Sequence, residues 1–477
     1  MPSTKKLIML VVMLAAFSAS VAIARAETQS LETLLAYLKS PNPGTRCDAA
    51  HKLGQRRVRN QLAVEALAVA ARKDEDRNVR IEALQSLGMI KDFSALPEML
   101  DALRDENSEV RGIAIKSLVA LYTEHDIDFI LNRREGWNLF NPFLDTKDHE
   151  IVESYVAVDP TIVSAIGESA RGDRDRAVRI SAIRALGVLR GSAAILHMAD
   201  ALAADQDVRI EVLRAFIKIG DPSAGRYVIP FFRDSNQQVR TQAMVAAGML
   251  KYKPAVMPLL SVYGLRAEKK GTIKTVADKM KGRLTYLPPR DEAALWSLSL
   301  IGDEHAEQVF VENMTSDDAD RRQYAIEGLA RIADVRYLDQ ISQLVAKEKN
   351  NDVKLAEFWA LYKMGSATNI QYIVRKLDTD QEAQARAYLM EANSPSDLYP
   401  YIRSSSTQIN RKVIEILGRI GDQDTIKELD PVVKTSGAAT ADVATLAMKR
   451  IEWRMSGRPR ASDTVLQRER PRRATNP

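Results

Sequence analysis

The residue types that most often carry out catalysis are few in this 477-residue sequence and lie far apart. No two histidines lie at the i, i+4 spacing that places two metal ligands on one helix face. There is no G-x-S-x-G nucleophile turn and no glycine-rich phosphate loop. The five histidines are His51, His125, His149, His197 and His305. We therefore predict that the protein is not an enzyme and has no catalytic residue, no metal site and no cofactor.

Two stretches of the sequence instead collect side chains suited to binding. The first, residues 122–160, gathers large aromatic residues and arginines within a short span. Such residues dominate the binding energy of protein interfaces. The stretch is therefore predicted either to anchor a partner protein or to fold back and fill the core. Its candidate residues are Trp137, Phe140, Phe143, Arg133 and Arg134.

The second stretch, residues 264–291, is strongly basic. Eight basic residues face two acidic ones between residues 266 and 290, a net charge of +6. This composition indicates either a solvated excursion of the chain or a site for an acidic partner, such as an anionic envelope polymer. The candidate binding residues are Lys269, Lys270, Lys274 and Lys279.

These stretches interrupt a sequence that otherwise repeats itself. Residues 77–88 read RNVRIEALQSLG, and residues 176–187 read RAVRISAIRALG. Val-Arg pairs recur with steps of 31, 68, 30 and 31 residues, each after an acid-rich turn. Within a unit, the apolar residues fall on one stripe of a helix. A fixed period of this size predicts stacked helix pairs that bury their apolar faces jointly.

The repeated unit also predicts where its second helix starts, ends and contacts its neighbours. Asp74 and Asp76 are expected to cap the helix that follows them. Gly88 is expected to end that helix in the left-handed conformation. A small residue recurs four positions after four of the five valines, as close helix packing requires. It is Ala83, Ala114, Ala182 or Ala243 in the clearest units.

The acidic turn, the Val-Arg pair, the alanine and the final Leu-Gly together resemble the HEAT-like repeats of the short phycobilisome-lyase type. The resemblance extends from about residue 30 to residue 453. It implies an all-α fold, a right-handed α-solenoid of about 12 HEAT-like helix pairs. It also implies a ladder of turn acids and arginines between neighbouring units, although the arginines could instead be solvated charges at helix starts. The ladder arginines would be Arg80, Arg111, Arg179, Arg209 and Arg240.

Both ends of the chain differ from the repeats. Lys5 and Lys6 precede an apolar stretch that ends at Ala24-Arg25-Ala26, the pattern of a secretory signal cleaved after Ala26. The alternative is an uncleaved N-terminal membrane anchor, because the stretch is close to the shortest span of a bilayer. Residues 454–477 are rich in arginine and proline and are predicted to be disordered. Their arginines would contact anionic polymers or lipid head groups, or only keep the tail solvated.

The single cysteine allows no intramolecular disulfide. Cys47 occupies the place that Ile81 and Ile180 take in later units. This position favours a small buried apolar residue. The alternative is a thiol that pairs with another molecule in an oxidising compartment.

The charge of the solenoid excludes one broad class of function. Residues 1–26 carry +3 and residues 454–477 carry +5 of the total charge of +5, so residues 27–453 carry −3. A solenoid with a negative net charge is not the basic cradle expected of a nucleic-acid-binding protein.

The sequence thus predicts seven segments. They are a signal peptide (1–26), N-terminal repeats (27–121), an aromatic insertion (122–160), central repeats (161–263), a basic insertion (264–291), degenerate C-terminal repeats (292–453) and a disordered tail (454–477).

We expect an exported periplasmic or secreted scaffold that binds an unidentified partner protein. One alternative is a binder of anionic envelope polymers that uses the basic insertion and the tail. The other is a lyase-like enzyme, although a bilin lyase acts in the cytoplasm and the signal sequence argues against that location.

Overall fold

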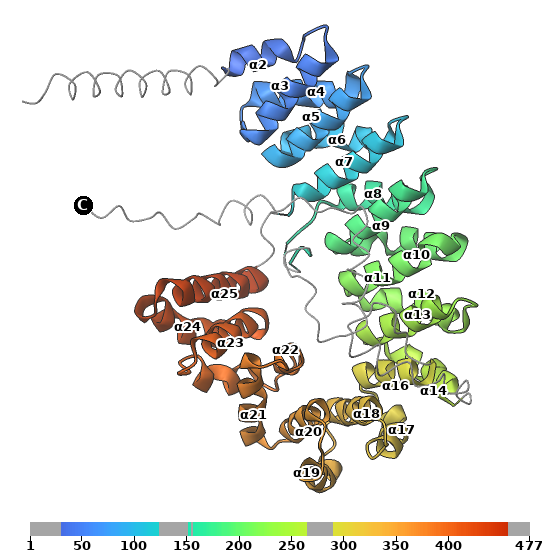
Figure 1. The fold of residues 1–477 in the computed structure, drawn as a ribbon, viewed down its shortest axis with the longest axis vertical. Coiled ribbons are helices and arrows are strands. Elements are labelled where there is room, and N and C mark those ends of the chain that lie inside the picture. The colour runs from blue at the N-terminus through green and yellow to red at the C-terminus, as the bar shows by residue number, and fades with distance from the viewer. Residues whose placement is uncertain (1–29, 124–150, 154–155, 265–289, 457–477) are drawn as a thin grey trace, which may run out of the picture. The chain divides into compact units, whose positions relative to one another are not determined.

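The computed structural model describes residues 30–123, 151–153, 156–264 and 290–456. In these residues the chain is an all-α solenoid made of two compact units, residues 1–121 and residues 122–477. Each unit is a series of helix pairs in which the second helix of one pair packs against the second helix of the next (Figure 1). None of the helices in the described ranges is long and apolar enough to span a bilayer.

The first unit holds three helix pairs in its described part. The pairs are α2 (Leu31–Tyr37) with α3 (Pro43–Gln55), α4 (Gln61–Lys73) with α5 (Arg77–Ile90), and α6 (Leu96–Asp101) with α7 (Ser108–Ala120). The second helices α3, α5 and α7 pack in sequence against one another.

The second unit continues the pattern for nine pairs within the described residues. The first elements of the pairs are α8 (Pro160–Gly172), α10 (Ile195–Ala204), α12 (Gly225–Val228), α14 (Val256–Tyr263), α17 (Glu307–Asn313), α19 (Leu338–Val345), α21 (Ile370–Arg375), the 3-10 helix η14 (Pro395–Tyr401) and α24 (Gln423–Thr435). The second helices are α9 (Arg176–Val188), α11 (Arg209–Ile219), α13 (Gln237–Met249), α16 (Arg290–Ile301), α18 (Ala319–Ile332), α20 (Asn351–Lys363), α22 (Glu382–Met390), α23 (Thr407–Ile420) and α25 (Ala438–Ser456). The two units therefore supply twelve pairs, the number that the repeat pattern predicted.

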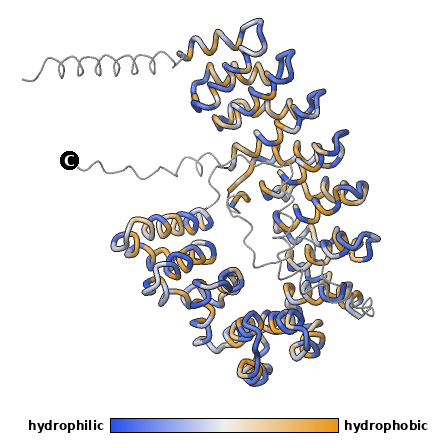
Figure 2. The backbone as a smooth tube through the Cα atoms, in the orientation of Figure 1, coloured by the Kyte–Doolittle hydropathy of each residue, from blue (hydrophilic) through white to orange (hydrophobic). Residues whose placement is uncertain are grey.

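Hydrophobic residues lie along the helices and hydrophilic residues dominate the turns between them (Figure 2). The alanines predicted at the helix contacts are all fully buried, from Ala83 to Ala243. Because the second helices within each unit pack against one another, the pairs share one continuous core along that unit.

The repeated glycine has a different role from the one predicted for it. Gly88 does not end its helix, because α5 continues to Ile90 and Lys91 takes the left-handed conformation with φ 57°. A Cβ atom on Gly88 would lie 3.1 Å from the Cα atom of Ser117 in α7. The missing side chain at this position therefore lets two second helices approach closely.

The turn before each second helix uses its two polar residues for different purposes. Asp76 caps α5, because its side chain accepts hydrogen bonds from the N–H groups of Asn78 and Val79. Asp74 does not cap the helix. Its carboxylate accepts the N–H of Asp76 and two hydrogen bonds of 2.7 Å from Arg46 of the preceding pair.

The arginines of the repeats link successive turns. The Nη1 atom of Arg80 donates to the carbonyl oxygens of Asp74 and Glu75 in its own turn. Its Nε atom lies 2.8 Å from the carboxylate of Asp105 in the next turn. Each guanidinium group thus binds the backbone of one turn and the side chain of the next.

The same arrangement recurs along both units. The pairs are Arg46 with Asp74, Arg80 with Asp105, Arg179 with Asp205, Arg209 with Asp234, and Arg322 with Glu348. Arg111 and Arg240 bind the carbonyl oxygens of their own turns, and the chain after each of their pairs includes residues outside the described ranges.

Adding a side chain at a glycine that contacts a neighbouring helix should lower stability more than adding one at a glycine with open space around it. A Cβ atom on Gly54 of α3 would lie 2.7 Å from the Cα atom of Ser86 in α5. We predict that Gly54→Ala lowers the free energy of unfolding by about 1–3 kcal/mol, since the two helices must move apart. Gly112→Ala is the matched control, because nothing lies within 4 Å of its Cβ position. It should raise stability by up to about 1 kcal/mol through higher helix propensity. Urea denaturation of both variants checks the ranking, and equal effects would contradict the assigned contact.

The ladder should contribute more than an exposed ion pair in the same unit. The side chains of Arg80 and Asp105 are 9% and 11% exposed, whereas those of Arg72 and Asp101 are 52% and 46% exposed. We predict that Arg80→Ala lowers the free energy of unfolding by about 2–3 kcal/mol, because it leaves a buried carboxylate without its partner. Arg72→Ala should change it by no more than about 1 kcal/mol. If thermal melts showed the same loss of stability for both variants, the ladder would contribute no more than an ordinary surface ion pair.

Candidate arginine pocket on the second helices

The residues first considered for partner binding lie outside the described residues. They are Arg133, Arg134, Trp137, Phe140 and Phe143 of the aromatic stretch and Lys269, Lys270, Lys274 and Lys279 of the basic stretch. Their binding roles stay predictions from the sequence.

Three of the five histidines fall within the described chain, and each faces a carboxylate. Nδ1 of His51 lies 2.7 Å from Glu82, Nε2 of His197 lies 3.1 Å from Glu168, and Nδ1 of His305 lies 2.7 Å from Asp303. No three histidine, cysteine or acidic residues gather as metal ligands in the described part of the chain. Cys47 is partly buried rather than fully buried, and burial raises the pKa of its thiol.

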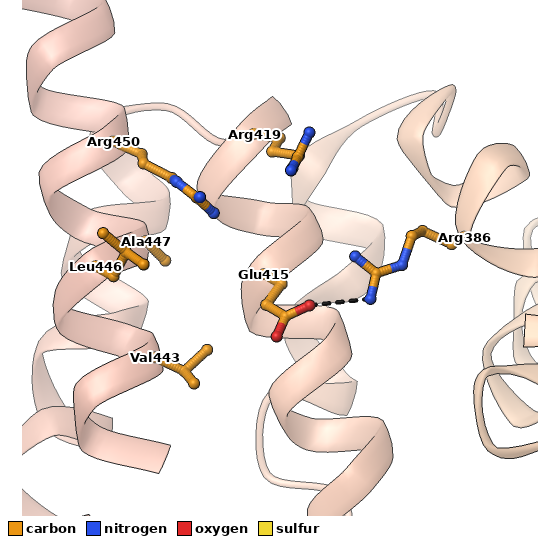
Figure 3. A pocket seen from close by; sticks show the side chains of 7 residues that line it. All are labelled: Arg386, Glu415, Arg419, Val443, Leu446, Ala447 and Arg450. Carbon is orange, nitrogen blue, oxygen red and sulfur yellow. Dashed lines mark hydrogen bonds and ion pairs between the residues drawn. The ribbon is translucent and has the colours of Figure 1, made fainter. Parts of the chain in front are cut away.

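A pocket with a cavity volume of about 220 Å³ lies between the second helices α22, α23 and α25. Its lining residues are Arg386 of α22, Glu415 and Arg419 of α23, and Val443, Leu446, Ala447 and Arg450 of α25. Figure 3 shows three arginine side chains around Glu415, with Val443 and Leu446 on the neighbouring helix. We call this site the arginine pocket.

The pocket combines excess positive charge with an apolar wall. Arg386 donates to Glu415 at 2.9 Å and lies 3.4 Å from Glu382. Glu382 also forms an ion pair with Lys412, whose Nζ atom lies 2.8 Å from the carboxylate. The lining itself holds three guanidinium groups and one carboxylate. Such a site suits a ligand that carries an acid beside an apolar group.

A buried polar network fixes α22 and hence Arg386. Glu327 of α18 is fully buried and accepts a hydrogen bond of 2.7 Å from the hydroxyl of Tyr388 in α22. The ring of Tyr388 stacks on Trp359 of α20 with centroids 4.3 Å apart. Arg331 of α18 lies 4.9 Å from the ring centroid of Trp359 and 3.1 Å from the carboxylate of Glu391. The hydroxyl of Tyr388 thus joins α22 to α18, two second helices that are not consecutive.

The last helix is held against α23 by Arg454. Its guanidinium group donates to the carbonyl oxygens of Gly418, Arg419 and Gly421 at the end of α23. Arg454 therefore belongs to α25, which continues to Ser456, and not to the predicted disordered tail that began at residue 454. The reason is that the C-terminal carbonyl groups of α23 need donors that the helix itself cannot supply.

Sequence reasoning missed some ladder members and the whole arginine pocket. Arg46 and Arg322 lack the preceding valine, but each is followed three residues later by a buried alanine, Ala49 and Ala325. That spacing is a signal that could have found them. Arg419 and Arg450 are 31 residues apart, which is the repeat period, so they occupy one register of adjacent second helices.

A comparison with known protein families finds that a model described as HEAT repeats matches residues 64–135. The helix pairs, their polar turns and the ladder agree with this match. The matched residues thus resemble HEAT repeats, and the helix pairs of the described chain continue the same architecture beyond them. Phycocyanobilin lyase subunit alpha from a Picosynechococcus strain is 24% identical over 262 residues, which cover 53% of this chain and 88% of that protein. This similarity agrees with the repeat type that the sequence resembled.

Two solved structures are similar to this chain at low sequence identity. The complex of CpcE and CpcF of phycocyanin lyase from Nostoc sp. PCC7120 matches with 18% identity and a TM-score of 0.26, over 71% of this chain and 95% of that chain. Yeast importin-β (Kap95p) matches with 12% identity and a TM-score of 0.39, over 92% of this chain and 70% of that chain. At these values the likeness concerns the fold alone.

One buried acid of this protein has a strongly perturbed pKa. Burial, followed by the nearby charge of Glu348, raises the pKa of Glu357 in α20 from 4.5 to about 7. Burial would also raise the pKa of Glu348, but hydrogen bonds from Arg322 and the N–H of Asn350 lower it. Glu348 therefore carries the ladder charge, whereas Glu357 keeps its proton up to about pH 7.

Glu357 should make the stability of the second unit depend on pH. Between about pH 4.5 and 7 the folded state binds a proton that the unfolded state has released, so stability falls as the pH rises. We predict that Glu357→Gln raises the free energy of unfolding by about 2 kcal/mol at pH 8 and changes it little at pH 5. Urea denaturation at both pH values tests this, with Glu382→Gln as a partly exposed control. A pH-independent effect of Glu357→Gln would contradict the perturbed pKa.

Proposed function

We propose that this protein is an exported scaffold that binds a partner protein through the arginine pocket. The observation that carries the proposal is the set of three arginines beside an apolar wall on the second helices α22, α23 and α25. Arginine is one of the residue types that dominate interface energy, and an apolar wall offers surface that a partner can bury. A solenoid also presents its second helices as one continuous surface, which suits an extended partner.

The name of the relative, phycocyanobilin lyase subunit alpha, supports the proposal that this protein binds another chain. The relative is called a subunit, so that protein works together with at least one other chain. The same similarity is the observation that favours a lyase-like alternative for this chain. Capture of phycocyanobilin-carrying proteins alone would favour that alternative over a general scaffold.

The proposed location rests on the sequence. Two lysines, an apolar stretch and Ala24-Arg25-Ala26 form the pattern of a cleaved secretory signal. A partner is therefore expected in the cell envelope or outside the cell, and the bait for its capture is the chain that begins at Glu27.

Changing the arginine pocket should remove the partner without unfolding the protein. We predict that Arg419→Gln with Leu446→Gln lowers capture of the crosslinked partner from envelope extracts at least tenfold, because charge and apolar contact are lost together. The measurement is quantitative mass spectrometry of the crosslinked species, with thermal melts to verify folding.

The matched control changes the same residue types on the first helices. Leu196 of α10 and Arg226 of α12 are exposed, so Leu196→Gln with Arg226→Gln should leave capture unchanged. Equal capture by the pocket variant and the wild type would overturn the proposed binding site.

A further inference from the structure

The arginine pocket already has an acidic neighbour from a distant part of the chain. The Nη2 atom of Arg450 lies 2.9 Å from the carboxylate of Glu153, nearly 300 residues earlier in the same compact unit. Both side chains are mostly buried, at 15% and 28% exposed. Contact between the start of the unit and its last helix is not required by the repeat, because each pair needs only its neighbours.

Glu153 is placed by the backbone and not by a helix of its own. The N–H of Val152 donates to the carbonyl oxygen of Val188 at 2.8 Å. Nε of Arg190 donates to the carbonyl oxygen of Val152 at 3.0 Å, and Val152 is buried. These bonds attach residues 151–153 to the C-terminal end of α9. The acid thus follows a buried apolar residue and faces the rim of the arginine pocket.

Arg450 is not saturated by this contact. Its Nε atom is buried and has no hydrogen-bond partner among the described residues. A guanidinium group can donate five hydrogen bonds and forms its strongest pairs with a carboxylate through two of them. The single contact with Glu153 therefore leaves a donor that a better placed carboxylate could use.

We infer that the arginine pocket binds an acidic segment of a partner protein and that Glu153 of this chain competes for the same arginine. In this arrangement a glutamate or aspartate of the partner binds Arg450, and an adjacent apolar side chain packs on Val443 and Leu446. Glu153 must leave Arg450 before the segment binds. The inference deepens the proposed function, since it names the chemistry of the partner at that pocket.

The competition predicts the direction of one substitution. When Glu153 occupies the site in most molecules, only the remaining fraction can bind the ligand. The apparent affinity is therefore the intrinsic affinity multiplied by that fraction. Glu153→Gln removes the competing charge and keeps the size of the side chain. It should therefore strengthen binding of an acidic segment, whereas loss of an ordinary structural ion pair would weaken binding or leave it unchanged.

The experiment uses the full mature chain and a short fluorescein-labelled peptide of glutamate and leucine with glycine spacers. A peptide with glutamine in place of glutamate is the control probe. We expect Glu153→Gln to tighten binding of the acidic peptide by roughly 3–10-fold in fluorescence anisotropy, as expected for release of a mostly occupied site. Arg450→Gln should weaken it about tenfold, and Glu153→Gln should bring no gain in the Arg450→Gln background.

A conservative variant separates competition from loss of folding. Glu153→Asp keeps the charge and should bind the acidic peptide more weakly than Glu153→Gln. Thermal melts of every variant verify the fold. Unchanged or weaker peptide binding by both folded Glu153 variants, or an equal gain with the glutamine peptide, overturns the inference.

The two proposals can fail separately. If peptide affinity does not change in the Glu153 variants while the pocket variant still loses its crosslinked partner, the competition is wrong and the proposed binding site is retained. If peptide affinity changes as predicted in the Glu153 and Arg450 variants while the pocket variant captures its partner as the wild type does, the pocket chemistry is retained and the proposed function is wrong.

Discussion

The arginine that joins each turn to the next is the interaction on which the solenoid depends. Its Nη1 atom binds carbonyl oxygens of its own turn, and its Nε and Nη2 atoms face the carboxylate of the following turn, as in Arg46 with Asp74. A planar guanidinium group with fixed donor directions sets the distance and orientation of two turns at once, which a lysine could not do. The turn carbonyls and the carboxylate are removed from water together, so each would be costly to leave unpaired.

Fixed turns bring the second helices into register, and this explains the small residues along their contacts. Ala83 and Gly88 of α5 both lie where another side chain would push neighbouring helices apart. The first elements of the pairs are less constrained, and several are short or 3-10 helices, such as α12 and η14. Regularity in this protein therefore belongs to the second helices and the turns before them, and these are the surfaces that adjacent pairs share.

The fold was predictable from the sequence because the same few contacts recur. The Val-Arg pair, the acidic turn and the buried alanine each report a local requirement, and repetition separates them from chance. Gly88 was misassigned because a left-handed helix end and a close helix contact both exclude a Cβ atom, and sequence alone does not distinguish them. The arginine pocket could not be predicted, since its residues lie on three helices whose contacts depend on curvature. The contact of Arg450 with Glu153 spans most of a unit and has no local signal at all.

The second half of the solenoid departs from the repeat where its chemistry is richest. Glu327, Arg331 and Tyr388 form a buried polar network on α18 and α22. A buried network of this kind adds little stability over an apolar core, but its hydrogen bonds accept only one arrangement of helices. It fixes the curvature that brings α22 toward α18 and sets the direction in which Arg386 enters the arginine pocket. The repeats thus supply a regular frame, and the residues that break the repeat shape the arginine pocket, where we propose that a partner protein binds.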